Sequence, residues 1–452
     1  MKSIVPASAL KLFLLMVGMV IFAGCSDTFT GGEEATPEPT LRQGKLRHPY
    51  LMDRAYTSKG SGKFGNESSL NLILSINKQS TLERYNVLER YTTLERYNVL
   101  ERYEYTNVFA GYAITVEDSL GLSEYNAFLD ELENDPDIIW YEPDFTVDLP
   151  EAAAATGQTG QLIPWSVAAV GGKESWTVSG NGYGVVNVDV FILDTGVARA
   201  LRYDPDDDLY LYASEDIRKG HSDPADHDGH GTHIAGIVGA IDDQDNLVGI
   251  APGARIHNLK VLNDNGTTDV SVVVAAMEEV IAWKQAHPGK PAVVNLSIGE
   301  NIGTSAYTSL DEAVEAALDA GIVVVAAAGN YGADAINVTP AHVEGAITVG
   351  SYDVNGVFSS FSNYGSMVDL LAPGEAVISL GINQEGPKSM SGTSMAAAHV
   401  TGAAALYVAK HPRASPLEVR TALLDAARDF VVGEPVGTTG KSVWVGPVET
   451  QY

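Results

Sequence analysis

The spacing of apolar and polar residues changes along the chain and divides the sequence near residue 150. Before that point, alternating apolar and polar residues predict two strands, LNLILSI (70–76) and GYAITV (111–116). LSEYNAFLDELENDP (122–136) has the spacing of a helix, and IIWYEPDFTV (138–147) predicts a last strand. This order predicts a compact α+β domain over residues 46–150.

Beyond residue 162 the predicted strands are continuous apolar runs rich in β-branched residues, separated by helix-patterned stretches. Runs of this kind are buried on both faces, which is typical of parallel strands covered by helices. We therefore predict a layered α/β domain with a mostly parallel sheet over residues 162–452. The strand runs are VDVFILD (188–194), RIHNLKVL (255–262), AVVNLSI (292–298), GIVVVAAAG (321–329) and GAITVGS (345–351), and the helical stretches are VSVVVAAMEEVIAWKQ (270–285) and SLDEAVEAALDA (309–320).

Three further segments complete the expected organisation. Residues 1–25 contain lysines and then the apolar run LFLLMVGMVIFAGC, which is too short for a membrane span and fits a signal segment. The run ends in FAGC, which resembles a bacterial lipobox; lipid on Cys25 and ordinary signal cleavage nearby are both open. Residues 26–45 predict a flexible tether, and residues 151–161 predict a linker that proteases can reach.

The charge balance is strongly acidic, with 28 basic and 58 acidic residues and a formal net charge of −30 at pH 7. It argues against nucleic acid as a partner and predicts a solvated acidic surface, with tolerance of high salt as the alternative. Because Cys25 is the only cysteine, the chain has no internal disulfide. Its stability must come from packing, with bound ions as a further source.

The tetrapeptide LERY recurs at Leu82, Leu88, Leu94 and Leu100, a period of six. On a helix this period scatters the leucines around the axis, whereas on a strand it places them on one face. Two interpretations are open, a binding repeat and a tandem duplication of one strand-entry segment. Under the second, we expect the fold to use the last copy, residues 100–103.

Three reactive side chains stand where predicted strands end or predicted helices begin: Asp194 in VFILDTG, His230 in GHGTHIAGIVGA and Ser394 in SGTSMAAAHVTG. A serine hydroxyl becomes a nucleophile when an imidazole takes its proton, and a carboxylate fixes the tautomer of that imidazole. A serine at a helix start also has backbone N–H groups near developing negative charge. The chain order and the GTSMA sequence differ from those of α/β-hydrolases.

These motifs and their order resemble those of the subtilisin-like serine proteases, over about residues 163–445. GNYGADAINVTPAHVEGAITVGS and SSFSNYGSMVDLLAPG are most similar to the proteinase K branch. The resemblance implies a subtilisin-like three-layer fold and a serine endopeptidase of broad specificity that needs no cofactor for its chemistry. Asp194 would orient the base, His230 would be the general base and then acid, Ser394 the nucleophile and Asn330 an oxyanion donor.

The same resemblance implies how a protein or peptide substrate is held. The substrate backbone would be added as a strand between two segments of the enzyme, which gives affinity with little demand on sequence. The residues on the two sides are Ser297, Ile298 and Gly299 in NLSIG, and Gly266 in DNGTTD.

Three histidines three residues apart, His227, His230 and His233, also raise the possibility of a zinc site. A zinc site needs three imidazoles that converge on one metal, and HGTH lacks the H-E-x-x-H pattern. We expect His233 to have a packing or hydrogen-bonding role, and His227 to lie at the rim of the substrate site.

AIDDQDNLVGIAP (240–252) resembles the calcium-binding loop of some subtilisins. Asp243 would be a ligand there and Asp206 a more distant carboxylate, since hard oxygen ligands suit structural Ca²⁺. The alternative is an acidic surface loop without a metal.

VFAGYAITV and IIWYEPDFTV resemble the inhibitor-like propeptides of this family. The resemblance implies that the ferredoxin-like domain of residues 46–150 assists folding and then occupies the active site, and that the enzyme cuts its own chain within residues 149–161. With lipid on Cys25, a membrane-anchored precursor would release a mature enzyme outside the cytoplasm, in the periplasm or the medium. A peptide-binding pseudoenzyme and a metal-dependent hydrolase are the alternatives.

Overall fold

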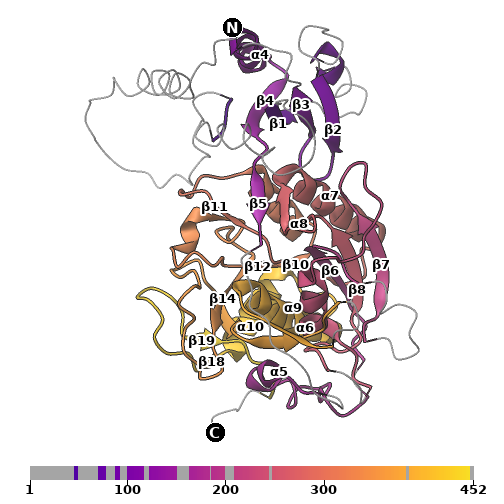
Figure 1. Cartoon of the computed structure of the whole chain (residues 1–452), viewed down its shortest axis with the longest axis vertical. Coiled ribbons are helices and arrows are strands. Elements are labelled where there is room, and N and C mark those ends of the chain that lie inside the picture. Colours follow the sequence, from indigo (N-terminus) through magenta and orange to yellow (C-terminus); the bar gives the residue numbers. More distant parts are fainter. Residues whose placement is uncertain are drawn as a thin grey trace.

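The computed structural model describes residues 45–48, 70–77, 87–91, 99–116, 122–149, 162–183, 185–198, 208–243, 247–382 and 386–447. A small domain is stacked on a larger one, and a single strand, β5 (Thr146–Asp148), runs from the first into the second (Figure 1). Within these residues, no helix is both long enough and apolar enough to cross a membrane.

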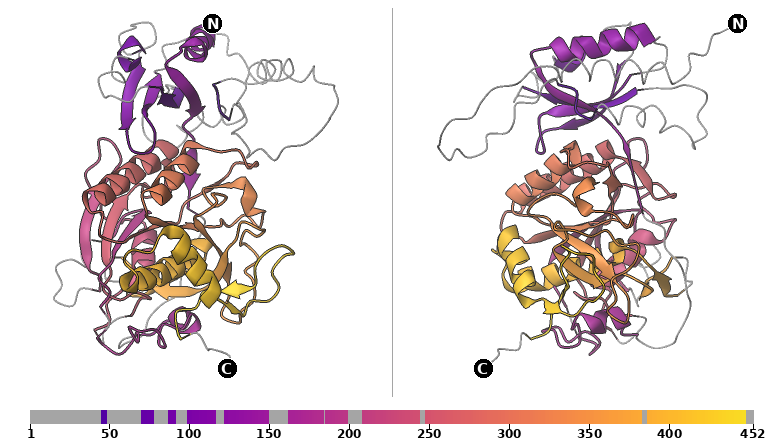
Figure 2. Two further views of the ribbon diagram at one scale, coloured as in Figure 1. Left: turned by 180° about the vertical axis from the view of Figure 1, so that it is seen from behind. Right: turned by 90° about the vertical axis from the view of Figure 1, so that its left-hand side faces the viewer.

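The small domain is an antiparallel sheet of four strands in the order β2-β3-β1-β4. A helical turn at 87–91 follows the first strand and helix α4 follows the third, which gives the β-α-β-β-α-β order of a ferredoxin-like unit. Helix α4 crosses one face of the sheet (Figure 2). The strands are β1 (Leu70–Ile76), β2 (Val99–Tyr105), β3 (Gly111–Val116) and β4 (Ile138–Pro143), and the helix is α4 (Leu122–Asn134).

The single strand predicted over residues 138–147 is wrong, because the chain leaves the small sheet after Pro143. Asp144 is fully buried and accepts hydrogen bonds from the backbone N–H of Ser271 at 2.9 Å and from its hydroxyl at 2.5 Å. Ser271 lies in the first turn of a helix of the large domain, where N–H groups have no partner within the helix. Here the chain leaves the small sheet, and the next residues form β5, the end of the small domain, which pairs with β9 (Thr267–Asp269) of the large domain.

The LERY copies differ in structure although their sequences are identical. Residues 88–91 are helical, with Leu88 packed in the core at 3% exposure. Residues 100–103 lie in β2, where Leu100 is 47% exposed. The last copy is thus the one found in the sheet, as expected under the duplication interpretation. The first and third copies lie outside the described residues.

The large domain has a nine-stranded sheet in the order β18-β19-β15-β14-β12-β10-β6-β8-β7, in which all pairs but β18–β19 are parallel. Its strands are β6 (Asp189–Asp194), β7 (Leu211–Asp216), β8 (Arg255–Lys260), β10 (Ala292–Leu296), β12 (Val323–Ala327), β14 (Ile347–Tyr352), β15 (Leu370–Pro373), β18 (Arg428–Asp429) and β19 (Lys441–Ser442). Shorter strands outside it are β9 (Thr267–Asp269), β11 (Glu300–Asn301), β13 (Val338–Thr339), β16 (Val377–Ser379) and β17 (Lys388–Met390).

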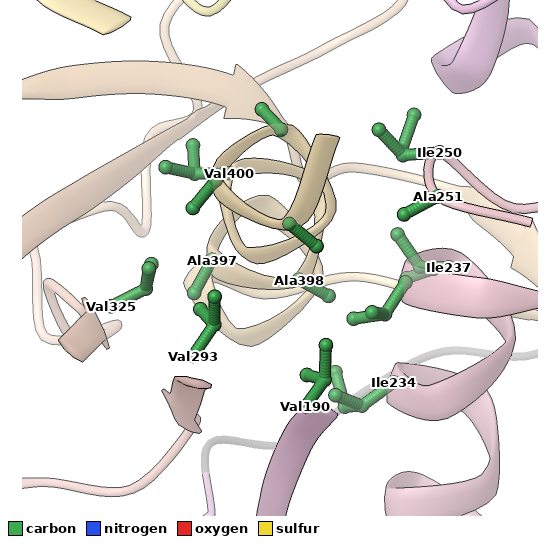
Figure 3. Packing of buried hydrophobic residues seen from close by; sticks show 14 of the residues in the cluster. Val190, Ile234, Ile237, Ile250, Ala251, Val293, Val325, Ala397, Ala398 and Val400 are labelled. Carbon is green, nitrogen blue, oxygen red and sulfur yellow. The ribbon is translucent and has the colours of Figure 1, made fainter. Parts of the chain in front are cut away.

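Helices cover both faces of this sheet, which confirms the layered α/β prediction. Val190 and Ile192 of β6 pack in one core with α6 and α9, whereas Phe191 and Leu193 pack in the other with α7 and α8. In the first core, small residues such as Ala397 let α9 lie close to the strands (Figure 3). The helices are α5 (Trp165–Ala169), α6 (His230–Gly239), α7 (Val270–Ala286), α8 (Ser309–Asp319), α9 (Thr393–Lys410) and α10 (Pro416–Ala426).

Candidate active site

A buried carboxylate and a buried imidazole meet where a central strand ends and a helix begins. Asp194 is the last residue of β6, and His230 is the first residue of α6. His230 Nδ1 lies 2.8 Å from Asp194 Oδ1. This contact makes Nδ1 the protonated nitrogen, so that Nε2 is left as the proton acceptor.

The surroundings of His230 favour its charged form. Burial lowers the pKa of His230, but the charge of Asp194 and its hydrogen bond raise it more, and the charges of Asp228 and Asp226 add to the increase. The net pKa therefore lies above the ordinary value of 6.5. Such a site stabilises the imidazolium that forms when the histidine takes a proton.

Ser394 is the second residue of α9, the helix that packs against α6. Its hydroxyl donates to the carbonyl oxygen of Ser297 at 3.4 Å. Among the described residues His230 Nε2 has no hydrogen-bond partner, so the serine and histidine side chains are not hydrogen-bonded here. As a first-turn residue, Ser394 has a backbone N–H that points out of the helix start and can bind an anion.

Asn330 follows β12 and is held by the start of α9. Its Oδ1 accepts hydrogen bonds from the N–H of Thr393 at 2.9 Å and from its hydroxyl at 2.8 Å. The carboxamide oxygen is therefore committed to Thr393, and the Nδ2 group faces Gly392, where an added Cβ would lie 3.0 Å from it. Thr393 is the threonine of the GTS motif, and this contact with Asn330 was not predicted from the sequence.

The expected substrate segments lie on the two sides of β5. On one side, β5 pairs with β9 in antiparallel register, and the Leu149 N–H donates to Gly266 O at 2.9 Å. On the other side, Asp148 forms an antiparallel bridge with Gly299. Gly266 has a φ of 73°, which is a conformation that favours glycine. Both glycines thus lie beside one extended segment of this chain's own small domain.

The three histidines do not converge. His233 is buried in α6, and its Nε2 lies 3.1 Å from two backbone carbonyls, those of Val377 and Lys388. Burial and the nearby His230 lower the pKa of His233 to about 3, so it is neutral. His227 is exposed and contacts Asp223 at 3.1 Å. Because each imidazole has its own partners, this geometry does not form a zinc ligand set.

The predicted calcium ligands are described only in part. Asp243 is exposed, whereas Asp206 and residues 244–246 lie outside the described residues. The neighbouring Asp242 is buried, and its two carboxylate oxygens accept backbone N–H groups of residues 180–182. Over the described part of the chain, no three His, Cys, Asp or Glu side chains form a group that could hold a metal. Calcium here stays a prediction, as does lipid on Cys25, which also lies outside the described residues.

A second buried carboxylate, Asp226, connects the strand of Asp194 to the helix of His230. It accepts hydrogen bonds from the hydroxyl of Thr195 at 2.9 Å and from the N–H of Thr232 at 2.9 Å. This role of Asp226 was not predicted from the sequence. The available signal was an aspartate four residues before the histidine, but nothing in its spacing showed which groups it would bind.

Comparison with known proteins identifies the family of this chain. Residues 158–442 match the subtilase family, Peptidase_S8. The chain is 35% identical to an extracellular serine proteinase of Thermus sp. (strain Rt41A), in an alignment that covers 73% of each chain. It is 37% identical to subtilisin DY from Bacillus licheniformis, in an alignment that covers 60% of this chain and 93% of subtilisin DY.

Among solved structures, the chain resembles a cold adapted subtilisin-like serine proteinase, with a TM-score of 0.52 and 32% identity. The match covers 62% of this chain and 97% of the other. This likeness confirms the subtilisin-like fold predicted from the sequence. The chain belongs to the subtilase family and is a subtilisin-like serine peptidase.

Proposed function

We propose that this protein is an exported serine endopeptidase of broad specificity, made as a precursor that cuts itself. Asp194 orients the base, His230 is the general base and then acid, and Ser394 is the nucleophile. The observation that carries the proposal is the buried 2.8 Å contact between His230 and Asp194, beside the helix start that bears Ser394. Export is supported by the Thermus relative, whose name describes an extracellular enzyme.

The proposed reaction follows from the positions of these groups. His230 Nε2 takes the hydroxyl proton of Ser394 as the oxygen attacks the scissile carbonyl, and Asp194 stabilises the imidazolium. The resulting oxyanion accepts hydrogen bonds from Asn330 Nδ2 and from the Ser394 N–H. His230 then donates its proton to the leaving amine, and a water molecule repeats the sequence to release the acyl group.

The small domain is proposed to be the inhibitor of this same enzyme. Its segment β5 pairs with β9 by backbone hydrogen bonds and bridges to Gly299, as an extended substrate would. Pairing through the backbone makes little demand on side chains, which supports broad specificity. The residues that follow β5 and Leu149 in the chain would come next along the substrate site. We therefore expect self-cleavage within residues 149–161.

Ser394→Ala tests the chemistry and the maturation together. We expect the variant to remain at precursor length. Its peptidase rate should fall to a residual value about 10³–10⁴-fold above that of the uncatalysed reaction in water. Ser222→Ala, which changes an exposed serine, is the control and should mature normally. Mass spectrometry of the purified chains gives the outcome, and maturation of Ser394→Ala in a protease-free preparation would contradict self-processing.

We also propose that lipid on Cys25 anchors the precursor to the membrane and that self-cleavage releases the enzyme. The anchor would lie on the small-domain side of the cut, so cleavage would remove the only proposed link. In cell fractions, Ser394→Ala should stay with membranes, and Cys25→Ser should lose that attachment. Mature wild-type enzyme that sediments with membranes, after its N-terminus is mapped to residues 149–161, would refute release.

A further inference from the structure

The loop that carries Asn330 is closed by one buried side chain, that of Asn363. Asn363 is fully buried, and its Nδ2 donates to the carbonyl oxygen of Ala328 at 2.7 Å. Its Oδ1 accepts the N–H groups of Tyr331 and Ala333, each at 3.0 Å. The carboxamide therefore binds the backbone on both sides of Asn330.

The fit between Asn363 and this loop is close. The backbone N–H of Asn363 donates to Gly329 O at 2.9 Å. Gly329 has a φ of 97°, and a Cβ there would lie 2.5 Å from Asn363 Nδ2. The position requires a donor and an acceptor on one short planar group, which among side chains of this length asparagine alone supplies. Both polar atoms of this buried carboxamide are hydrogen-bonded, so that its burial does not leave an unpaired polar group.

The rest of the loop is held without this carboxamide. Gly332 N–H donates to Phe361 O, and Ala335 N–H donates to Tyr364 O, both at 2.9 Å. From the other side, Thr393 binds the carboxamide oxygen of Asn330. Removing the Asn363 carboxamide should therefore loosen the few residues around Asn330 and leave the loop as a whole in place.

We propose that Asn363 is a positioning residue for the oxyanion donor Asn330. The inference rests on the proposed function of Asn330 and goes beyond it, because Asn363 acts only through the place it gives that side chain. An oxyanion donor is effective at about 2.7–3.1 Å from the oxygen. A displacement of about 1 Å in an active site can cost 10²-fold in rate.

Two variants remove the contact in different ways. Asn363→Asp keeps the shape and the acceptor but sets an oxygen against Ala328 O, and Asn363→Ala removes the whole carboxamide. Each is made in the wild type and in Asn330→Ala, and each precursor is matured by tagged wild-type enzyme that is then removed. A peptide substrate gives kcat and KM, and a peptide aldehyde reports binding of a tetrahedral adduct.

In the wild-type background we expect kcat to fall about 10- to 100-fold, with KM changed less than about twofold. Binding of the aldehyde should weaken by a similar factor, since its adduct carries the oxygen that Asn330 would bind. In the Asn330→Ala background the same substitutions should change kcat less than about threefold, because the donor that Asn363 positions is gone.

Val368→Ala is the matched structural control, because Val368 is 4% exposed and packs in the same small core as Ala328. It should lower the melting temperature and leave kcat unchanged. An equal loss of kcat from Asn363 variants in both backgrounds, or a loss confined to KM, would overturn the inference. If Asn330→Ala alone leaves kcat unchanged, the proposed role of Asn330 fails first, and this inference fails with it.

Discussion

Glu278 on α7 offers a direct test of how the small domain would be retained after the proposed self-cleavage. Its carboxylate accepts hydrogen bonds from the tip of the β2–β3 hairpin. The donors are the backbone N–H groups of Thr106, Asn107 and Val108, at 2.7–2.9 Å, and the side chains of Thr106 and Asn107, at 2.6 and 2.8 Å. Glu278→Ala leaves these donors without their shared acceptor.

The expected loss of binding free energy follows from the number of these hydrogen bonds and their exposure to water. Truncating one partner of a buried, hydrogen-bonded charge at an interface costs about 2–5 kcal/mol. Glu278 is half-buried, and water can replace part of what is lost, so we expect about 2–3 kcal/mol, at the lower end of that range. Since about 1.4 kcal/mol is a factor of ten, the small domain should bind about 30- to 140-fold more weakly.

The assay uses the full chain, in which the proposed self-cleavage would leave the small domain bound without a covalent link. The delay between cleavage, seen by mass, and the appearance of peptidase activity should shorten in Glu278→Ala. Glu278→Gln keeps one acceptor oxygen and should be intermediate, and Glu279→Ala changes the exposed neighbouring glutamate as a control. Equal delays in Glu278→Ala and Glu279→Ala would refute this account of the interface.

Two further predictions concern the pH dependence of activity and the effect of calcium on stability. Because the general base must be neutral and the pKa of His230 is raised, kcat/KM should fall on the acid side with a midpoint above 6.5. Asp228→Asn removes a charge that raises this pKa, so the midpoint should move to lower pH; an unmoved midpoint in the pH–rate profile would contradict the assignment. Calcium at a hundred times its Kd should stabilise Ser394→Ala by about 2.7 kcal/mol in thermal melts, and Asp243→Ala should abolish the response. A melt that chelation leaves unchanged would make residues 240–252 an acidic loop.

The sequence predicted elements well where burial alone decides them. The strands at 70–76 and 111–116 have the predicted bounds, although both faces are buried: Leu72 packs in the core of the small domain and Ile73 packs with residues of the large domain. The prediction over residues 138–147 was wrong because Asp144 leaves the small sheet and accepts a hydrogen bond from Ser271, 127 positions away in the sequence. The LERY copies make the same point, because the same four residues are helical at 88–91 and extended at 100–103.

The candidate site divides in a similar way. Asp194, His230 and Ser394 could be named from short motifs, because their chemistry requires those residue types at strand ends and helix starts. Asn363 and Asp226 could not, because their roles are set by backbone groups that only the fold brings to them. The catalytic roles themselves stay predictions until the substitutions are measured.

The contact between Asp144 and Ser271 has a consequence for the stability of the large domain once the proposed cleavage has separated it from the small domain. Helix α8 has its own capping box, formed by Thr308 and Asp311, whereas the N-cap of α7, Asp269, makes no capping hydrogen bond with its side chain. The start of α7 thus relies on an acceptor from the small domain, and a lost cap costs about 1 kcal/mol. We expect the isolated large domain to refold poorly, so that its survival depends on how slowly it unfolds. Such an enzyme would stay folded because it unfolds slowly. An unfolded molecule would lack Asp144, the acceptor that completes the start of α7, and would refold poorly.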